Sequence, residues 1–137
     1  MIRSVIAIIA GYLVFAVSAV LLFSISGRDP HDAVPAWFLV TTILYGCAFA
    51  ALGGYLAALI ARRKAFRHAA ILTIVIGALA LVSLLSRPGK GAIWSQLSAI
   101  LLMAPSAMAG GYVRNQQSEK VSSALNRERA ENRVVER

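Results

Sequence analysis

The sequence predicts an all-α integral membrane protein in which four transmembrane helices form a bundle. Of its 137 residues, 58% are hydrophobic, which is more apolar surface than a soluble core of this size can bury. Asp, Glu, Lys and Arg are also absent from four long runs, which cover residues 4–27, 33–61, 69–86 and 91–113. Each run is long enough to supply the roughly 17–25 residues that cross about 30 Å of hydrocarbon.

The first span is expected at about residues 4–26. Its apolar run is longer than the hydrophobic segment of a signal peptide, so we expect a retained helix, although the small residues of 24–26 resemble a cleavage site. The loop from Gly27 to Asp32 is rich in turn-forming residues and ends this helix.

The second span is expected at about residues 34–61. Pro35 lies where such a helix starts, and its missing N–H does no harm in the first turn. The basic segment 62–68 is short enough to allow only an antiparallel return. A third span follows at about residues 69–86.

The fourth span is expected at about residues 92–113, after a Pro- and Gly-containing turn. Pro105 lies inside this span and is predicted to kink the helix. Residues 114–137 alternate Arg and Glu with few apolar residues, which predicts a charged tail that is flexible or partly helical. The chain thus divides into a transmembrane domain, residues 1–113, and a cytoplasmic tail.

The cations beside the spans predict the orientation, because Lys and Arg are enriched in cytoplasmic loops. One side carries Arg3, Arg62, Arg63, Lys64, Arg67, Arg114 and Lys120, and the other carries Arg28, Arg87 and Lys90. Both termini are therefore expected to be cytoplasmic, in a multi-pass protein of a bacterial inner membrane.

Aromatic residues at the ends of the spans agree with this orientation, because Trp and Tyr are enriched at both membrane interfaces. We expect Trp37, Trp94, Tyr55 and Tyr112 to be interface anchors.

The formal net charge of +8 is explained by anionic lipid headgroups, since the basic residues lie at the ends of apolar runs. No basic surface is interleaved with aromatic residues, so nucleic acid is not an expected partner. The predicted lipid contacts are Arg62, Arg63, Lys64 and Arg67.

The second and fourth spans resemble each other when the sequence is shifted by 57 positions. The shift places Trp37 on Trp94 and the Gly-Gly-Tyr segment of residues 53–55 on that of residues 110–112. This match predicts two tandem helical hairpins related by an axis along the membrane normal. The alternative is that both helices need the same anchors and small residues, because the first and third spans match poorly.

Small residues recur every fourth position along the second span and again in the fourth. Such stripes let helix backbones approach closely, and van der Waals contact then holds the helices together in lipid. The stripe either packs inside the bundle or docks a partner protein or a second copy. Its predicted members are Gly46, Ala50, Gly54, Ala58, Ala107 and Gly111.

Proton-coupled transport commonly depends on ionisable side chains at membrane depth, and the four runs contain none. The chain is similar in length and predicted helix count to the small multidrug exporters, which depend on a membrane-embedded Glu in the first helix. The first Glu here is Glu119, so this resemblance is limited to architecture. The two histidines, His31 and His68, lie in loops on opposite sides, too far apart to share a haem.

Other chemistry is also not expected. The lone Cys47 has no partner for a disulfide or a thiol redox pair. Asp29, His31 and Asp32 share one turn, where such residues are more often solvated than bound to metal, and Asp32 is expected to cap the second helix. We therefore predict no catalytic residue, no cofactor, no metal site and no enzyme activity.

Two functions lead, and a membrane-embedded enzyme comes third, because its catalysis would have to come from loop groups such as Asp29, His31 and Asp32 alone. The first is a non-enzymatic accessory or assembly subunit that acts by helix packing, with a membrane-protein partner or a second copy. The second is a small channel or carrier for a neutral or lipid-like solute. A polar-lined cavity reaching the middle of the bilayer would favour the second, and a core filled entirely by Leu, Ile, Ala and Gly would count against it. The residues expected near the solute path are Tyr12, Thr41, Tyr45, Ser98 and Ser106.

Overall fold

The structure is a computed structural model that describes residues 2–28, 34–61, 65–86 and 93–135. The described residues form helices joined by loops, and four helical stretches are long and apolar enough to span a membrane. The prediction of an all-α chain with four helices long and apolar enough to span a membrane is therefore confirmed for the described residues. The helices are α1 (Ile2–Ser26), α2 (Ala36–Ala61), α3 (Ala65–Ser86), α4 (Ile93–Ser98), the π-helix η1 (Ala99–Met103) and α5 (Ala104–Val135).

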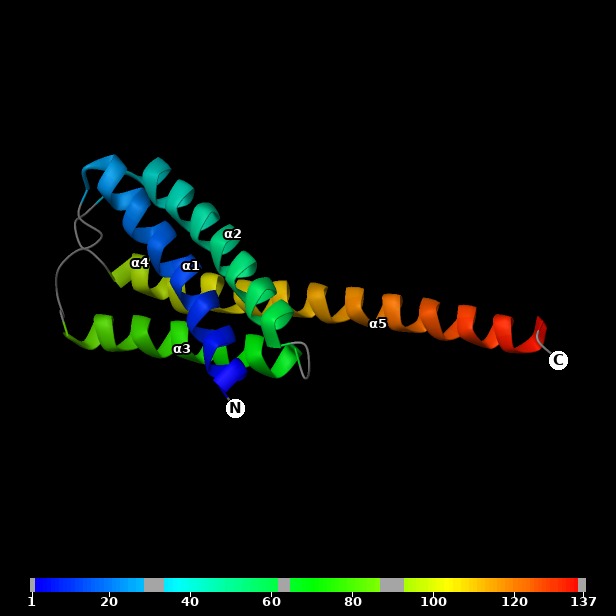
Figure 1. Cartoon of the computed structure of the whole chain (residues 1–137). Coiled ribbons are helices and arrows are strands. Elements are labelled where there is room, and N and C mark those ends of the chain that lie inside the picture. The colour runs from blue at the N-terminus through cyan, green and yellow to red at the C-terminus, as the bar shows by residue number, and fades with distance from the viewer. Residues whose placement is uncertain (1, 29–33, 62–64, 87–92, 136–137) are drawn as a thin grey trace.

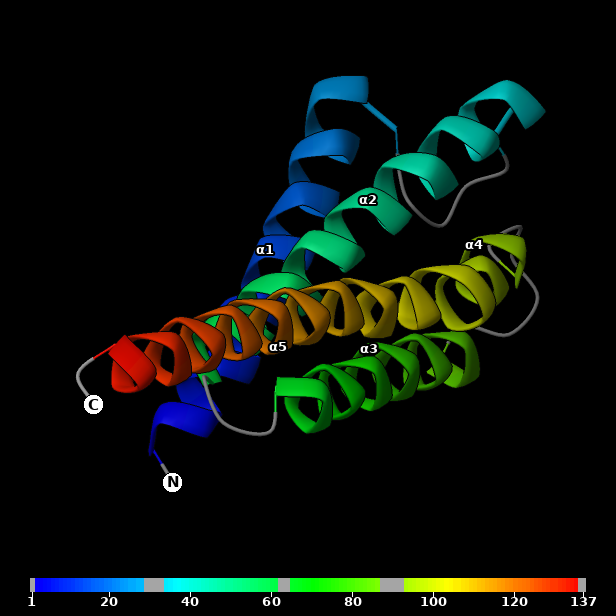
Figure 2. The same ribbon diagram turned by 90° about the vertical axis from the view of Figure 1, so that its right-hand side faces the viewer.

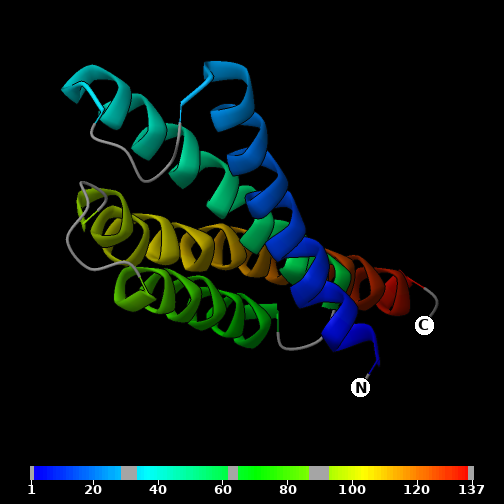
Figure 3. The same cartoon turned by 90° about the vertical axis from the view of Figure 1, so that its left-hand side faces the viewer.

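The helices are arranged as two hairpins that cross each other (Figure 1). Helix α1 packs along α2 in one hairpin, and α3 packs along the continuous helix formed by α4, η1 and α5 in the other. The two hairpins meet through α2 and α5 and then diverge toward the end that carries α4, as the views from the other two sides also show (Figures 2 and 3).

We call the two ends of the bundle the narrow half and the wide half. The narrow half lies around Gly11, Gly53, Gly54 and Ala107, where the hairpins cross. The wide half lies around residues 15–26 of α1, 36–46 of α2, 76–86 of α3 and 93–103 of α4 and η1, where the hairpins have diverged (Figure 3).

The helix ends differ by a few residues from the predicted spans. Helix α2 begins at Ala36, and the carbonyl of Pro35 accepts the N–H groups of Phe38 (3.0 Å) and Leu39 (3.1 Å). Pro35 therefore precedes the first helical residue instead of occupying it. Helix α3 begins at Ala65, earlier than the predicted residue 69, so Arg67 is already helical.

The fourth span contains a π-helix just before Pro105, where a kink was predicted. Pro105 has no N–H to donate, and its ring would clash with the carbonyl four residues earlier in a regular α-helix. In the structure the turn is widened, and the N–H of Ala104 donates to the carbonyl of Ala99. A π-turn is a common way for a helix to absorb such a local mismatch.

Helix α5 does not end with the apolar residues but continues to Val135, so the described part of the charged segment is helical. It extends alone beyond the bundle (Figure 1). One hydrogen bond ties its base to the bundle, because the hydroxyl of Tyr55 on α2 donates to Oε1 of Gln117 at 2.9 Å. A continuous helix follows from the lack of Gly or Pro after Gly111.

Candidate functional site: a cavity in the wide half

The narrow half is held together by glycines at backbone contact distance. A Cβ atom added to Gly11 of α1 would lie 2.6 Å from the carbonyl oxygen of Gly53, and one added to Gly53 of α2 would lie 2.5 Å from that of Gly11. These are closer than real Cβ atoms approach an oxygen, so only Gly fits at either position. Helices α1 and α2 therefore cross with their backbones touching.

The same kind of contact joins α2 to α5. A Cβ atom on Gly54 would strike the backbone carbonyl of Ala107, and one on Gly110 would strike that of Ala51. Gly111 faces the side chain of Ala69 on α3 in the same way. In the narrow half, Gly and Ala thus bring the helices into close contact, and the buried side chain of Leu72 packs beside Gly11.

Of the predicted small-residue stripe, Gly54, Ala107 and Gly111 take part in these contacts, whereas Gly46 packs against Met103 in the wide half. Each of its members is buried within a single chain, and Ala50 and Ala107 are 0% exposed. The stripe therefore serves internal packing, and it offers no surface to a partner in this conformation. Its members are Gly46, Ala50, Gly54, Ala58, Ala107 and Gly111.

The two Gly-Gly pairs of the predicted repeat make similar contacts in reversed order. In α2, Gly53 meets its hairpin partner α1 and Gly54 meets α5. In α5, Gly111 meets its hairpin partner α3 and Gly110 meets α2. The matched residues of the two segments therefore do not make equivalent contacts, and tandem duplication stays a prediction.

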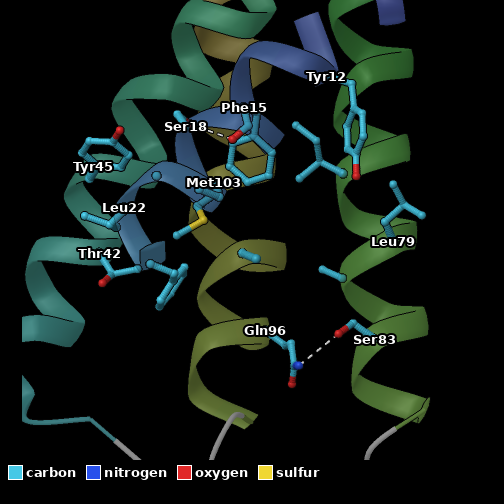
Figure 4. Close-up of a pocket in the computed structure, with 16 residues that line it drawn as sticks. Tyr12, Phe15, Ser18, Leu22, Thr42, Tyr45, Leu79, Ser83, Gln96 and Met103 are labelled. Carbon is cyan, nitrogen blue, oxygen red and sulfur yellow. Dashed lines mark hydrogen bonds between the residues drawn. The ribbon is translucent and has the colours of Figure 1, made fainter. Parts of the chain in front are cut away.

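A cavity of about 460 Å³ lies between the two hairpins in the wide half. Its volume falls within the roughly 300–1,000 Å³ of typical ligand pockets. Helices α1, α2, α3 and α4 and the π-helix η1 all contribute to its walls (Figure 4). Its polar lining residues are Tyr12, Ser18, Thr42, Tyr45, Ser83 and Gln96.

The floor of the cavity is apolar and lies where the hairpins begin to diverge. Met103 packs its side chain against Gly46, and Ile76 belongs to the buried core beside it. Phe15 and Leu79 line the opposing walls on α1 and α3 (Figure 4). These long side chains replace the Gly and Ala of the narrow half, so the backbones are held apart and space remains between them.

Two of the polar groups are already satisfied by their own helices. The hydroxyl of Ser18 donates to the carbonyl of Phe15 at 2.7 Å, and that of Thr42 donates to the carbonyl of Phe38 at 2.8 Å. Such bonds to the preceding turn are common for Ser and Thr in membrane helices. These residues add little polarity to the cavity.

The other polar groups are more available. Nε2 of Gln96 on α4 donates to the hydroxyl oxygen of Ser83 on α3 at 3.2 Å, near the wide end of the cavity (Figure 4). Tyr12 reaches across from α1 toward Leu79, and its hydroxyl has no hydrogen-bond partner among the described residues (Figure 4). Among the described residues that line it, none is Asp, Glu, Lys, Arg or His. The described lining is therefore uncharged and mostly apolar, with polar groups at a few positions.

At the outer end of the wide half, helix α1 ends in a defined capping arrangement. Gly27 adopts a left-handed backbone with a φ of 63°, and the N–H of Arg28 donates to the carbonyl of Phe23 at 3.3 Å. This is the helix-ending arrangement known as the Schellman motif. It places the Arg28 guanidinium 5.8 Å from the ring centre of Trp37 and 4.9 Å from that of Phe38, at cation–π distance.

The predicted interface anchors lie at both ends of the bundle. Trp37 is 64% exposed at the start of α2, and Tyr55 and Tyr112 lie toward the other end, each in a hydrogen bond with a glutamine of α5. The side chain of Trp94 lies outside the described residues, although its backbone belongs to α4.

The predicted basic cluster is described in part. Arg67 is exposed in the first turns of α3, while Arg62, Arg63 and Lys64 lie outside the described residues. The turn residues Asp29, His31 and Asp32, including the predicted helix cap, lie outside them as well.

The structure brings only some of the expected path residues to the cavity. Tyr12 and Tyr45 line it. The hydroxyl of Thr41 is exposed and donates to the carbonyl of Trp37, and that of Ser106 donates to the carbonyl of Leu102. Ser98 is buried but does not line the cavity.

Four polar lining residues were missing from the expected path. Ser83 lies three residues before the end of α3 and Gln96 three residues after the start of α4, so the sequence places both near the same end of the bundle. Ser18 and Thr42 carry no signal that separates them from other hydroxyl residues in the spans.

Comparisons of the chain with models of protein families, with curated proteins and with solved structures found no match.

Proposed function

We propose that this protein binds a neutral, lipid-like molecule in the cavity of its wide half and acts as a small membrane carrier. The observation that carries the proposal is the cavity itself, whose described lining residues are mostly apolar, include none with a charge and supply a few hydrogen-bonding groups. Ligand pockets are typically lined in this way.

The depth of the cavity supports a carrier. Its innermost lining residues on α1, α2 and α3 are Tyr12, Gly46 and Ile76, which lie near the middle of these helices, so the cavity extends from that level to the wide end. Beyond the floor, the helices of the narrow half are in backbone contact at Gly54 and Gly11. This arrangement supports a site that is accessible from one half of the membrane, and it does not favour a continuous channel.

The type of membrane, the orientation of the chain and its non-enzymatic role are also part of the proposal, and they rest on the sequence. The protein would lie in a bacterial inner membrane with both termini in the cytoplasm, which places the cavity in the outer half of the bilayer. The exposed Arg67 and the neighbouring cations would meet anionic headgroups at the cytoplasmic surface. The proposed role is non-enzymatic.

Native mass spectrometry of the purified protein tests the proposal. We expect a bound molecule of lipid-like mass on the wild-type chain and its loss in Ala80→Phe, because Ala80 lines the cavity and a phenyl ring would fill it. The matched control is Ala78→Phe, two residues away on the exposed face of α3. Equal adducts on both variants would contradict the proposal.

An accessory subunit is the second candidate, and one observation favours it. Helix α5 continues past the bundle with the apolar side chains of Val121 and Leu125 exposed, 60% and 52% respectively, where no lipid surrounds them if that part lies in the cytoplasm. Purification in mild detergent would retain a stoichiometric partner. Leu125→Glu should release this partner, whereas Ser122→Glu should not, and a chain that purifies alone would contradict this candidate.

A further inference from the structure

The polar groups of the cavity are distributed unevenly along its length. Gln96 lies near the start of α4 and Ser83 near the end of α3, so their hydrogen-bonded pair occupies the wide end. Toward the floor, the hydroxyls of Ser18 and Thr42 are used by their own helices, and the walls are formed mainly by Phe15, Leu79 and other apolar residues, with the Tyr12 hydroxyl beside Leu79 (Figure 4). The cavity therefore has an end with two hydrogen-bonding side chains and a deeper part that is apolar apart from the Tyr12 hydroxyl.

The Gln96–Ser83 pair keeps unused hydrogen-bonding capacity. A Gln side chain has two N–H donors and a carbonyl acceptor, and a Ser hydroxyl can donate while it accepts. The bond at 3.2 Å uses one N–H of Gln96 and one acceptor position of Ser83. Among the described residues, no further partner uses the second N–H, the amide oxygen or the Ser83 hydroxyl hydrogen, which are therefore available to a ligand. In an apolar environment, unpaired polar groups cost free energy.

The uncharged side chains of the described lining favour an uncharged head group on the ligand. Among the lining residues that the structure describes, a phosphate or carboxylate at the wide end would find no cation to offset its desolvation. An uncharged hydroxyl or carbonyl would be matched by the amide and hydroxyl that are present. Arg28 does not line the cavity and is held against Trp37 and Phe38.

We infer that the ligand is a neutral amphiphile with a single apolar chain and an uncharged hydrogen-bonding head, and that Gln96 and Ser83 bind the head while the chain fills the cavity toward Met103. This inference rests on the proposed function, because it names the chemical class that the same cavity takes. A cavity of about 460 Å³ suits one such chain better than the paired chains of a membrane phospholipid.

Photolabelling in liposomes tests the inference with two probes of equal chain length. One is a long-chain primary alcohol and the other the corresponding hydrocarbon, each with a diazirine in the middle of the chain, and adducts are counted by intact-mass spectrometry. We expect the wild-type protein to be labelled more by the alcohol, by about two- to tenfold, as one or two ligand hydrogen bonds would give. Gln96→Leu should lower alcohol labelling to the hydrocarbon level and leave hydrocarbon labelling unchanged.

The controls separate this inference from the proposed function. Gln116→Leu makes the same chemical change on α5, away from the cavity, and should leave both probes unaffected. Equal labelling of the wild-type protein by both probes, sensitive to Ala80→Phe but not to Gln96→Leu, would overturn the inference and leave the proposed function standing. Equal loss of both probes in Gln96→Leu would show a structural role and also overturn it. If neither probe labels the wild-type protein above the Ala80→Phe background, the proposed function fails as well.

Discussion

The two halves of this bundle are built from the same four spans but from different side chains. In the narrow half, Gly11, Gly53 and Gly54 bring backbones into contact. In the wide half, Phe15 and Met103 stand between the helices, and a cavity of about 460 Å³ remains. The comparison shows that side-chain size sets the distance between helices in lipid, where packing is the main attraction between them.

The two halves also have different roles, because the narrow half stabilises the bundle and the wide half contains the cavity. The backbone contacts of the narrow half fix how the two hairpins cross, and that crossing determines how far they diverge at the other end (Figure 3). The wide half can therefore hold a cavity without loss of the fold. Larger side chains should therefore destabilise the fold when placed in the narrow half and should be tolerated in the cavity of the wide half.

The largest effect is expected at the centre of the narrow half. Gly54→Ala would place a methyl group against the backbone carbonyl of Ala107, which cannot move without separating α2 from α5. We expect a loss of about 1–3 kcal/mol in the free energy of unfolding. The measurement is unfolding in mixed detergent micelles, followed by circular dichroism.

The matched control is Gly77→Ala in α3. No atom lies within 4 Å of a Cβ added there, so the change should stabilise the helix by up to about 1 kcal/mol. If both variants are neutral, the narrow half is not closed by backbone contact.

A smaller effect is expected where α1 ends in the wide half. Gly27 has a φ of 63°, and an Ala side chain in this left-handed conformation costs about 1–2 kcal/mol. We expect Gly27→Ala to lower the melting temperature modestly, and Gly27→Asn, which tolerates the conformation, to lower it less. Equal melting temperatures of Gly27→Ala and the wild-type protein would show that the Schellman motif contributes nothing.

Added bulk should be tolerated in the cavity. Ala80→Phe places a ring in existing space, so we expect a neutral or stabilising change of up to about 1 kcal/mol in unfolding. The same enlargement at Ala107, which is 0% exposed between α2 and α5, should be strongly destabilising. Comparable destabilisation by Ala80→Phe and Ala107→Phe would remove the distinction between the halves.

The smallest effect is expected at the base of the α5 extension. Tyr55→Phe removes an exposed hydrogen bond to Gln117, worth about 0.5 kcal/mol. In this variant, amide hydrogen exchange in residues 114–135 should become slightly faster. The control is Tyr112→Phe, because the partner of Tyr112, Gln116, lies on the same helix and the bond between Tyr55 of α2 and Gln117 stays intact. Unchanged exchange in Tyr55→Phe would mean that the extension is held by its own helix alone.

Much of the fold could be predicted from sequence because charge-free runs of membrane length have few alternatives. The four spans follow from this pattern, and small residues in α2 indicate a packing face. The predicted stripe includes Gly54 and not Gly77, but the sequence does not show that Gly54 meets a backbone carbonyl of α5. That contact depends on the crossing of the two hairpins, a property of the whole bundle.

Less of the candidate site could be predicted from the sequence. The hydroxyls of Thr41 and Thr42 are adjacent and chemically identical, yet only Thr42 lines the cavity. The contact of Gln96 with Ser83 joins two helices across a turn, and its pairing depends on the loop between them. The π-helix before Pro105 also changes which side of the fourth span each preceding residue faces, relative to a regular α-helix. A prediction that assumes a uniform helical period does not include this change.

The most direct test of this account is a map of the residues that react with a photoactivatable long-chain alcohol in liposomes, obtained by peptide mass spectrometry. The account predicts adducts concentrated on the cavity-lining residues of the wide half, such as Tyr12, Leu79 and Ala99, and their loss in Ala80→Phe. Adducts spread evenly over lipid-facing residues such as Leu44 and Ile74, unchanged by Ala80→Phe, would contradict it.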